Sequence, residues 1–138
     1  MYYSENGDEL KKFNTRDAVG LRLLREAGIK IGILTSENTK IVERRAKKIG
    51  VDILRQGCKD KAADLDDLLQ ELSLSPSEVA FIGDDINDLG ILKKVGFAAT
   101  PADGQPAVKA LAHYICQAKG GEGAVREVAE LILRGRNV

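Results

Sequence analysis

The chain has 138 residues, about the length of one domain, and its 43% hydrophobic and 30% charged residues are typical of a globular protein. Lysine plus arginine and aspartate plus glutamate balance at 21 each, which gives no electrostatic reason to expect nucleic acid or a membrane surface as a partner. No apolar run is long enough to cross a bilayer, and the first residues lack a signal-peptide pattern. Cys58 and Cys116 show no metal-ligand spacing. We therefore expect a cytoplasmic protein with a single domain over residues 1–138.

The first residues predict a β-hairpin and a helix. The segment Glu5-Asn6-Gly7 places an Asn-Gly pair between strand-like residues, which is a strong hairpin signal. Residues 17–27 have the apolar spacing of a helix, and Gly28 follows as a stop.

From residue 30 onwards, short apolar runs alternate with helical patterns. The predicted strands are residues 30–34, 51–54, 79–82, 97–99 and 114–116. The predicted helices are residues 39–49, a helix capped by Asp60, and residues 88–95, 106–112 and 123–133, with one further turn at 75–78. This alternation predicts an α/β fold with a doubly wound, Rossmann-like parallel sheet and helices on both faces.

Polar residues gather where the predicted strands end and helices begin, and in open α/β sheets ligands bind beyond the carboxyl ends of the strands. The three groups are Thr35-Ser36-Glu37, Asp60-Lys61, and Asp84-Asp85 with Asn87 and Asp88 one turn on. A hydroxyl and an ammonium at a helix N-terminus can bind phosphate. The carboxylates offer the hard oxygen ligands that Mg²⁺ prefers, and the metal would relieve their repulsion.

Each residue also has a structural interpretation. Thr35 could end a strand and cap the next helix. Lys61 alone would be a solvated surface lysine. Asp84, Asp85 and Asp88 could be turn and cap residues. The combination, in this order and at equivalent strand ends, favours a phosphate and metal site over three unrelated caps.

The order TSE, then a lysine at a helix start, then GDDIND resembles the motifs of the haloacid dehalogenase-type phosphohydrolases. The segments YYSENGDELKKFNTRDAVG, ILTSENTKIVERRAKKIGV, FIGDDINDLGILKKVG and KGGEGAVREVAELIL resemble one branch of them along the full length. This branch hydrolyses phosphates of 3-deoxy-2-ulosonic acids, and includes the 3-deoxy-manno-octulosonate 8-phosphate and 2-keto-3-deoxy-nononate 9-phosphate phosphatases. The C-terminal domain of a sialic-acid cytidylyltransferase is also similar.

The resemblance implies a capless domain, a Mg²⁺ cofactor, a small phosphorylated sugar acid as substrate and a homotetramer. It implies catalytic roles for Thr35, Lys61 and Asp88, with Thr35 on a phosphoryl oxygen and Lys61 neutralising the phosphoryl group. Asp84 and Asp85 would bind or support the metal. Ser36, Glu37 and Asn87 would contact the substrate. Glu37 stands where the octulosonate enzymes typically have arginine, which leans the prediction towards the nononate substrate.

One part of the family pattern has no match. The resemblance implies a first motif, DxDGxxTDG, on a central strand between the strands 30–34 and 79–82, and its first aspartate attacks phosphorus. No such motif precedes Thr35. We therefore expect an N-terminally incomplete domain with impaired or absent turnover. The alternative is a non-catalytic oligomerisation or ligand-binding domain.

Overall fold

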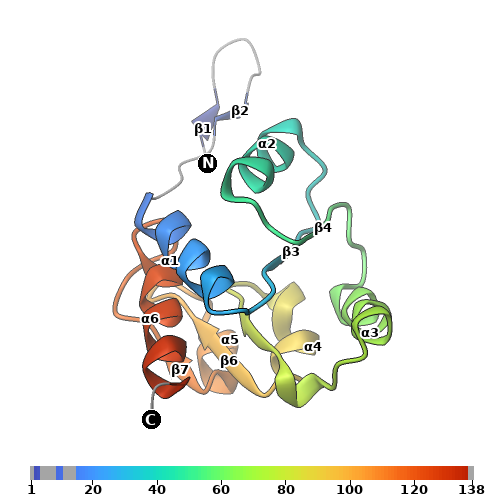
Figure 1. Ribbon diagram of the computed structural model, residues 1–138, viewed down its shortest axis with the longest axis vertical. Helices are drawn as coiled ribbons and strands as arrows, with labels where there is room; N and C mark the ends of the chain where they lie inside the picture. Colours follow the sequence, from blue (N-terminus) through green and yellow to red (C-terminus); the bar gives the residue numbers. More distant parts are fainter. Residues whose placement is uncertain (1, 4–8, 11–14, 137–138) are drawn as a thin grey trace.

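The computed structural model describes residues 2–3, 9–10 and 15–136 (Figure 1). Its strands are β1 (Tyr2–Tyr3), β2 (Glu9–Leu10), β3 (Gly32–Leu34), β4 (Ile53–Arg55), β5 (Ala80–Ile82), β6 (Phe97–Thr100) and β7 (Tyr114–Ile115). Its α-helices are α1 (Thr15–Glu26), α2 (Lys40–Ile49), α3 (Lys61–Leu72), α4 (Leu89–Leu92), α5 (Pro106–Leu111) and α6 (Ala124–Arg136). Two 3₁₀ turns, η1 (Pro76–Glu78) and η2 (Ile86–Asp88), complete the element order.

The predicted α/β alternation is confirmed, with boundaries that move by a few residues. The second predicted strand, 51–54, begins later, as β4. The predicted helix 88–95 is shorter, as α4, and the 3₁₀ turn η2 precedes it. β1 and β2 pair in antiparallel fashion, with Tyr2 opposite Leu10. The predicted Asn-Gly turn at residues 4–8 lies outside the described residues. None of the helices that the structure describes is long and apolar enough to span a membrane.

Strand β6 shows why helices cover both faces of its sheet. It pairs in parallel with β5 on one side and with β7 on the other. Ala98 packs into an apolar cluster with residues of α3, α4 and α5, whereas the next residue, Ala99, packs into a second cluster with α6. Because successive strand residues point to opposite faces, the two clusters lie on opposite sides of the sheet. This arrangement confirms the predicted layering.

A third apolar cluster fixes the position of α1. Leu24 of α1, Ile31 just before β3 and Ala129 of α6 are buried together. α1 and α6 therefore lie side by side, as Figure 1 shows in blue and red. They cover the face of the molecule opposite α3.

The parallel strands do not form one continuous sheet. β3 pairs with β4, and β5 pairs with β6, but β3 and β5 are not paired with each other. A cavity of about 910 Å³ lies between them. We call this cavity the β3–β5 slot: its edges are residues 31–34 and 79–82, and its faces are α3 on one side and α1 with α6 on the other.

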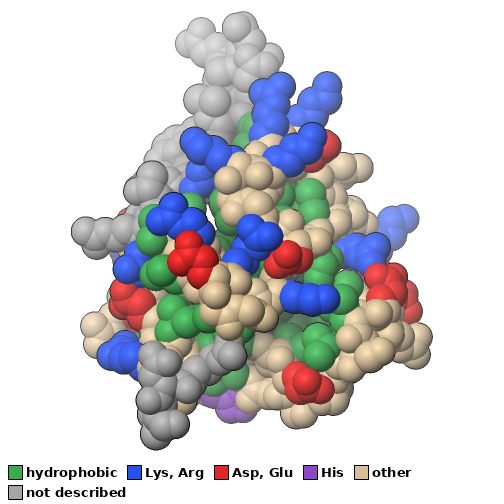
Figure 2. Space-filling view, viewed as in Figure 1, with side chains coloured by type: hydrophobic (Ala, Val, Ile, Leu, Met, Phe, Trp, Pro, Cys, Tyr) green, Lys and Arg blue, Asp and Glu red, His purple; other side chains and the backbone are tan. Residues whose placement is uncertain are grey.

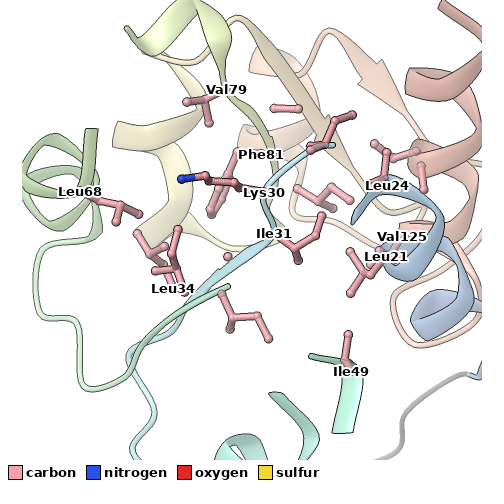
Figure 3. A pocket seen from close by; sticks show the side chains of 18 of the residues that line it. Leu21, Leu24, Lys30, Ile31, Leu34, Ile49, Leu68, Val79, Phe81 and Val125 are labelled. Atoms are coloured by element: carbon pink, nitrogen blue, oxygen red, sulfur yellow. The ribbon is translucent and has the colours of Figure 1, made fainter. Parts of the chain in front are cut away.

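The slot is apolar on both faces. Leu68 of α3 points into it from one side, and Leu21, Leu24 and Val125 point into it from the other (Figure 3). Seen from outside, hydrophobic side chains reach the surface across the middle of this side of the molecule (Figure 2). The slot is therefore an interruption of the core that stays open to solvent.

Burial along the strands differs accordingly. In β6, paired on both sides, Ala98, Ala99 and Thr100 are completely buried. In β3 and β5 no residue is buried, and Gly32 and Ala80 are exposed.

A close backbone contact beneath β6 gives a test of the packing. A Cβ atom at Gly96 would lie 2.2 Å from the carbonyl oxygen of Ser77 in η1. Because backbone atoms cannot move aside cheaply, Gly96→Ala should lower the free energy of unfolding by about 1–3 kcal/mol in urea denaturation. Gly135→Ala in α6 is the matched control, since its added Cβ would meet no described atom within 4 Å beyond its chain neighbours and the backbone of its own helix. It should be neutral or stabilising by up to about 1 kcal/mol, and equal destabilisation by both would refute this account.

Candidate active site at the carboxyl ends of β3 and β5

Thr35 directly follows β3 and is held by its backbone. Its N–H donates to the carbonyl of Arg55 (3.0 Å), and its carbonyl accepts from the N–H of Cys58 (2.9 Å). The Thr35 hydroxyl oxygen accepts from the N–H of Glu37 at 3.1 Å, which leaves its O–H free to donate to a ligand. Ser36 is exposed and Glu37 is half-buried beside it. These bonds join the end of β3 to the loop that leads into α3.

Lys61 is the first residue of α3. The helix is capped by Asp60, whose carboxylate accepts from the N–H of Ala63 at 3.2 Å. The predicted cap is therefore confirmed. The Lys61 ammonium donates to Asp88 Oδ1 at 2.7 Å, and only 12% of the Lys61 side chain and 5% of the Asp88 side chain are exposed. Lys61 is thus a buried partner of a carboxylate, contrary to the alternative of a solvated surface lysine.

Asp88 organises the loop after β5. While Oδ1 binds Lys61, Oδ2 accepts from the backbone N–H groups of Asp84 (3.0 Å) and Asp85 (3.3 Å). The loop can fold this closely around Asp88 because residue 83 is glycine. A Cβ at Gly83 would lie 2.7 Å from Asp88 Cβ. The buried carboxylate therefore sets the position of both preceding aspartates and of the lysine.

The remaining predicted residues of this loop lie at the surface. Asp84, Asp85 and Asn87 are exposed. Asp85 caps η2, its Oδ1 accepting from the N–H of Ile86 at 2.6 Å. The carbonyl of Asp84 accepts from the N–H of Gln105 at 3.0 Å, so the residue before α5 also holds the loop. Sequence reasoning missed Gln105, and its position just before Pro106 signalled only a helix start.

Among the carboxylates of this loop, Asp84 is the one whose negative charge a bound cation would stabilise most. Partial desolvation, followed by the charges of Asp88 and Asp85, raises the pKa of Asp84, and Lys61 offsets this only in part. Among the described residues no three His, Cys, Asp or Glu side chains form a complete metal cage. Mg²⁺ is commonly held by one or two carboxylates together with water and substrate phosphate, so Asp84 and Asp85 fit that mode.

Cys58 lies in the same loop as Lys61 and takes no part in this chemistry. It is buried, and its thiol donates to the carbonyl of Arg55 at 3.4 Å. Burial, with a hydrogen bond to Asp64, raises the pKa of the Cys58 thiol. The thiol therefore stays protonated at neutral pH, as expected for an unreactive cysteine.

The structure thus gathers the predicted groups at one edge. Thr35 is joined to Cys58, Lys61 follows within the same loop, and Lys61 is paired with Asp88. Asp88 in turn holds Asp84 and Asp85. This arrangement has a hydroxyl donor, an ammonium and two exposed carboxylates, which suits a phosphate group and a divalent cation.

Comparison with known proteins agrees with this arrangement. The family described as "haloacid dehalogenase-like hydrolase" matches residues 14–96. The 3-deoxy-D-manno-octulosonate 8-phosphate phosphatase of Yersinia pestis is 42% identical over 133 residues, which are 96% of this chain and 71% of that protein. The chain belongs to the haloacid dehalogenase-like hydrolases. This confirms the family that the sequence motifs resemble.

Solved structures of such hydrolases share the fold closely. The Yersinia pestis phosphatase of the same name superposes with a TM-score of 0.95 and 41% identity, covering 99% of this chain and 74% of that one. The 3-deoxy-D-manno-octulosonate 8-phosphate phosphatase of Moraxella catarrhalis has a TM-score of 0.95 and 39% identity, covering 99% and 78%. That hydrolase was crystallised with a magnesium ion, a phosphate ion and a KDO molecule.

Proposed function

We propose that this chain carries the phosphate- and metal-binding part of a Mg²⁺-dependent phosphatase that acts on a phosphorylated 3-deoxy-2-ulosonic acid. The observation that carries the proposal is the network in which the buried Asp88 binds Lys61 and the amides of Asp84 and Asp85 beside Thr35. Such a network holds the charged groups in place before a ligand arrives, which is how electrostatic stabilisation of phosphoryl transfer works.

Each residue then has a definite task. The Thr35 hydroxyl donates a hydrogen bond to a phosphoryl oxygen, and Lys61 neutralises phosphoryl charge. Asp84 and Asp85 hold Mg²⁺, which supplies charge neutralisation when it is bound. Asp88 acts as a positioning residue for the other groups. Ser36, Glu37 and Asn87 line the surface on which the sugar acid would lie.

The first candidate substrate is 3-deoxy-D-manno-octulosonate 8-phosphate. The Yersinia pestis and Moraxella catarrhalis relatives carry this name, and the latter was crystallised with the KDO molecule. Glu37 alone favours the nononate 9-phosphate. We give the relatives greater weight because they match nearly the whole chain, whereas Glu37 is one position.

None of the carboxylates described above is assigned as the nucleophile that attacks phosphorus. The carboxylates placed at this edge already have roles: Asp60 caps α3, Asp85 caps η2, Asp88 binds Lys61, and Asp84 is the best metal ligand. We propose that the nucleophile comes from a DxDGxxTDG segment, a motif that the 138-residue sequence does not contain. Since phosphoryl transfer depends on a nucleophile held in line, turnover by the chain of 138 residues should be low or absent.

A phosphatase assay tests the function. Release of phosphate from 3-deoxy-D-manno-octulosonate 8-phosphate and from the nononate 9-phosphate is measured with Mg²⁺ and with EDTA, for this chain and for a form extended by a DxDGxxTDG segment. Mg²⁺-dependent turnover is expected from the extended form alone. If the extended form stays inactive, the chain is a non-catalytic binding or oligomerisation domain. Robust turnover by the shorter chain would show that it has a nucleophile of its own and would refute this part of the proposal.

Binding of inorganic phosphate gives a test that does not need turnover. Thr35→Val removes the donor hydroxyl while keeping the shape, and a hydrogen bond to a charged group is worth about 1.5–3 kcal/mol. We therefore expect phosphate, in the presence of Mg²⁺, to bind at least about tenfold more weakly in calorimetry. Ser77→Ala in η1, away from the site, should leave binding unchanged. An unaltered affinity in Thr35→Val would remove Thr35 from the site.

Assembly into a homotetramer and a cytoplasmic location remain predictions. Sedimentation velocity would measure the first directly.

A further inference from the structure

Three large hydrophobic side chains are exposed among the described residues, and one of them lies in the loop of the candidate site. Ile86 is 64% exposed, whereas Ile115 on β7 and Leu111 at the end of α5 are 46% and 37% exposed. Ile86 stands between Asp85 and Asn87, and it belongs to none of the three apolar clusters of the core. Its side chain therefore contributes little to the core and is available to a ligand.

The backbone of η2 holds Ile86 in this position. The N–H of Ile86 donates to Asp85 Oδ1 at 2.6 Å, and the N–H of Leu89 donates to the carbonyl of Ile86. The N–H of Asp88 donates to the carbonyl of Asp85 at 2.9 Å, and the Asp88 carboxylate is itself held by Lys61. A β-branched side chain on a backbone fixed in this way loses little conformational freedom when a ligand binds.

The proposed substrate class has one part that the polar residues of the site do not match. A 3-deoxy-2-ulosonic acid carries a carboxylate, several hydroxyl groups and, at C3, a methylene group without a hydroxyl. Thr35 and Lys61 serve the phosphate, and the polar side chains of Ser36 and Asn87 suit hydroxyl groups. Packing Ile86 against the methylene would remove apolar surface of both from water. A hydroxyl at C3 would lose its water there without gaining a hydrogen-bond partner.

We propose that Ile86 is a specificity residue, which packs against the C3 methylene of the sugar acid and disfavours sugars with a hydroxyl at that carbon. The inference rests on the proposed function, because it takes the positions of phosphate and metal from it. Ile86 acts on the sugar part of the substrate alone, since its side chain has no group that binds phosphate or a metal ion. Covering on the order of 50 Å² of apolar surface changes an affinity by about eightfold.

Calorimetry with two sugar acid phosphates tests the inference. The compounds 2-keto-3-deoxygluconate 6-phosphate and 2-ketogluconate 6-phosphate differ only in the hydroxyl at C3, and each is titrated into the full chain with Mg²⁺. The unaltered chain should bind the deoxy compound about tenfold more tightly. Ile86→Thr keeps the β-branched shape but offers a hydroxyl, and it should reduce this preference to about threefold or less while inorganic phosphate binds as before. Ile115→Thr is the matched control, because β6 separates β7 from β5, and it should keep the full preference.

The titration with inorganic phosphate separates this inference from the proposed function. If the unaltered chain does not bind inorganic phosphate with Mg²⁺, the proposed function fails and the role of Ile86 fails with it. If phosphate binds, three results would overturn the role of Ile86 alone: no preference for the deoxy compound in the unaltered chain, the same preference in Ile86→Thr, or an equal loss of preference in Ile115→Thr. A smaller sedimentation coefficient for Ile86→Thr than for the unaltered chain would place Ile86 in a contact between copies and would also overturn it.

Discussion

Asp88→Ala should lower the free energy of unfolding by about 3–5 kcal/mol, because it leaves a buried ammonium without its partner. The Lys61–Asp88 pair is 2.7 Å long and both side chains are largely buried. The substitution also removes the acceptor for the N–H groups of Asp84 and Asp85. Urea denaturation at neutral pH measures the effect.

A matched control separates this effect from the loss of any ion pair. Asp66→Ala breaks the Lys94–Asp66 pair, which is 2.9 Å long but has side chains 43% and 52% exposed. Since exposed pairs contribute little, this change should be worth less than about 1 kcal/mol. Similar losses for the two variants would show that Asp88 is an ordinary surface carboxylate and would remove the central member of the proposed site.

Asp84→Asn should abolish specific Mg²⁺ binding and at the same time stabilise the metal-free chain at neutral pH. The neutral amide cannot replace the carboxylate as a metal ligand. It also removes an ionisable group whose pKa is raised by partial desolvation and, after that, by the charges of Asp88 and Asp85. Calorimetric titration with Mg²⁺ and thermal unfolding with and without the metal measure the two effects. Asp67→Asn, an exposed carboxylate of α3, is the control and should change neither.

The pH dependence of stability has a definite sign. The folded chain holds the Asp84 proton more tightly than the unfolded chain, whose pKa is near the model-peptide value of 3.8. The contribution of Asp84 is therefore most favourable below that value and is lost as pH rises through the raised pKa of the folded state. Asp84→Asn should remove this pH dependence from the free energy of unfolding. In the unaltered chain, Mg²⁺ binding should weaken as the pH is lowered through the same range. A variant that binds Mg²⁺ as well as the parent would contradict the metal assignment.

The sequence predicted the layers and the position of the site because both follow from local patterns. Strand residues 97–99 and the helices around them were recognisable from apolar spacing and caps. Placing Thr35, Lys61 and Asp84 at one edge needed only the rule that ligands gather beyond the carboxyl ends of parallel strands.

What the sequence could not show depends on contacts between distant segments. The burial of Asp88 arises because Gly83 lets the loop fold tightly around it and Lys61 comes in from another helix. The bond from Gln105 to Asp84 joins two loops that no periodicity connects. The family resemblance implied a central strand between residues 30–34 and 79–82, but nothing in the composition indicated that the space between β3 and β5 would be open with apolar faces.

The separation of β3 from β5 has an energetic consequence for ligand binding. Thr35 follows β3 of the β3–β4 sheet, and Asp84 follows β5 of the β5–β6–β7 sheet. A phosphate and a metal ion bound by both residues would therefore connect two sheets that share no strand. A ligand that binds only when both sheets are in place stabilises that arrangement, so Mg²⁺ and phosphate together should raise the free energy of unfolding of the whole chain.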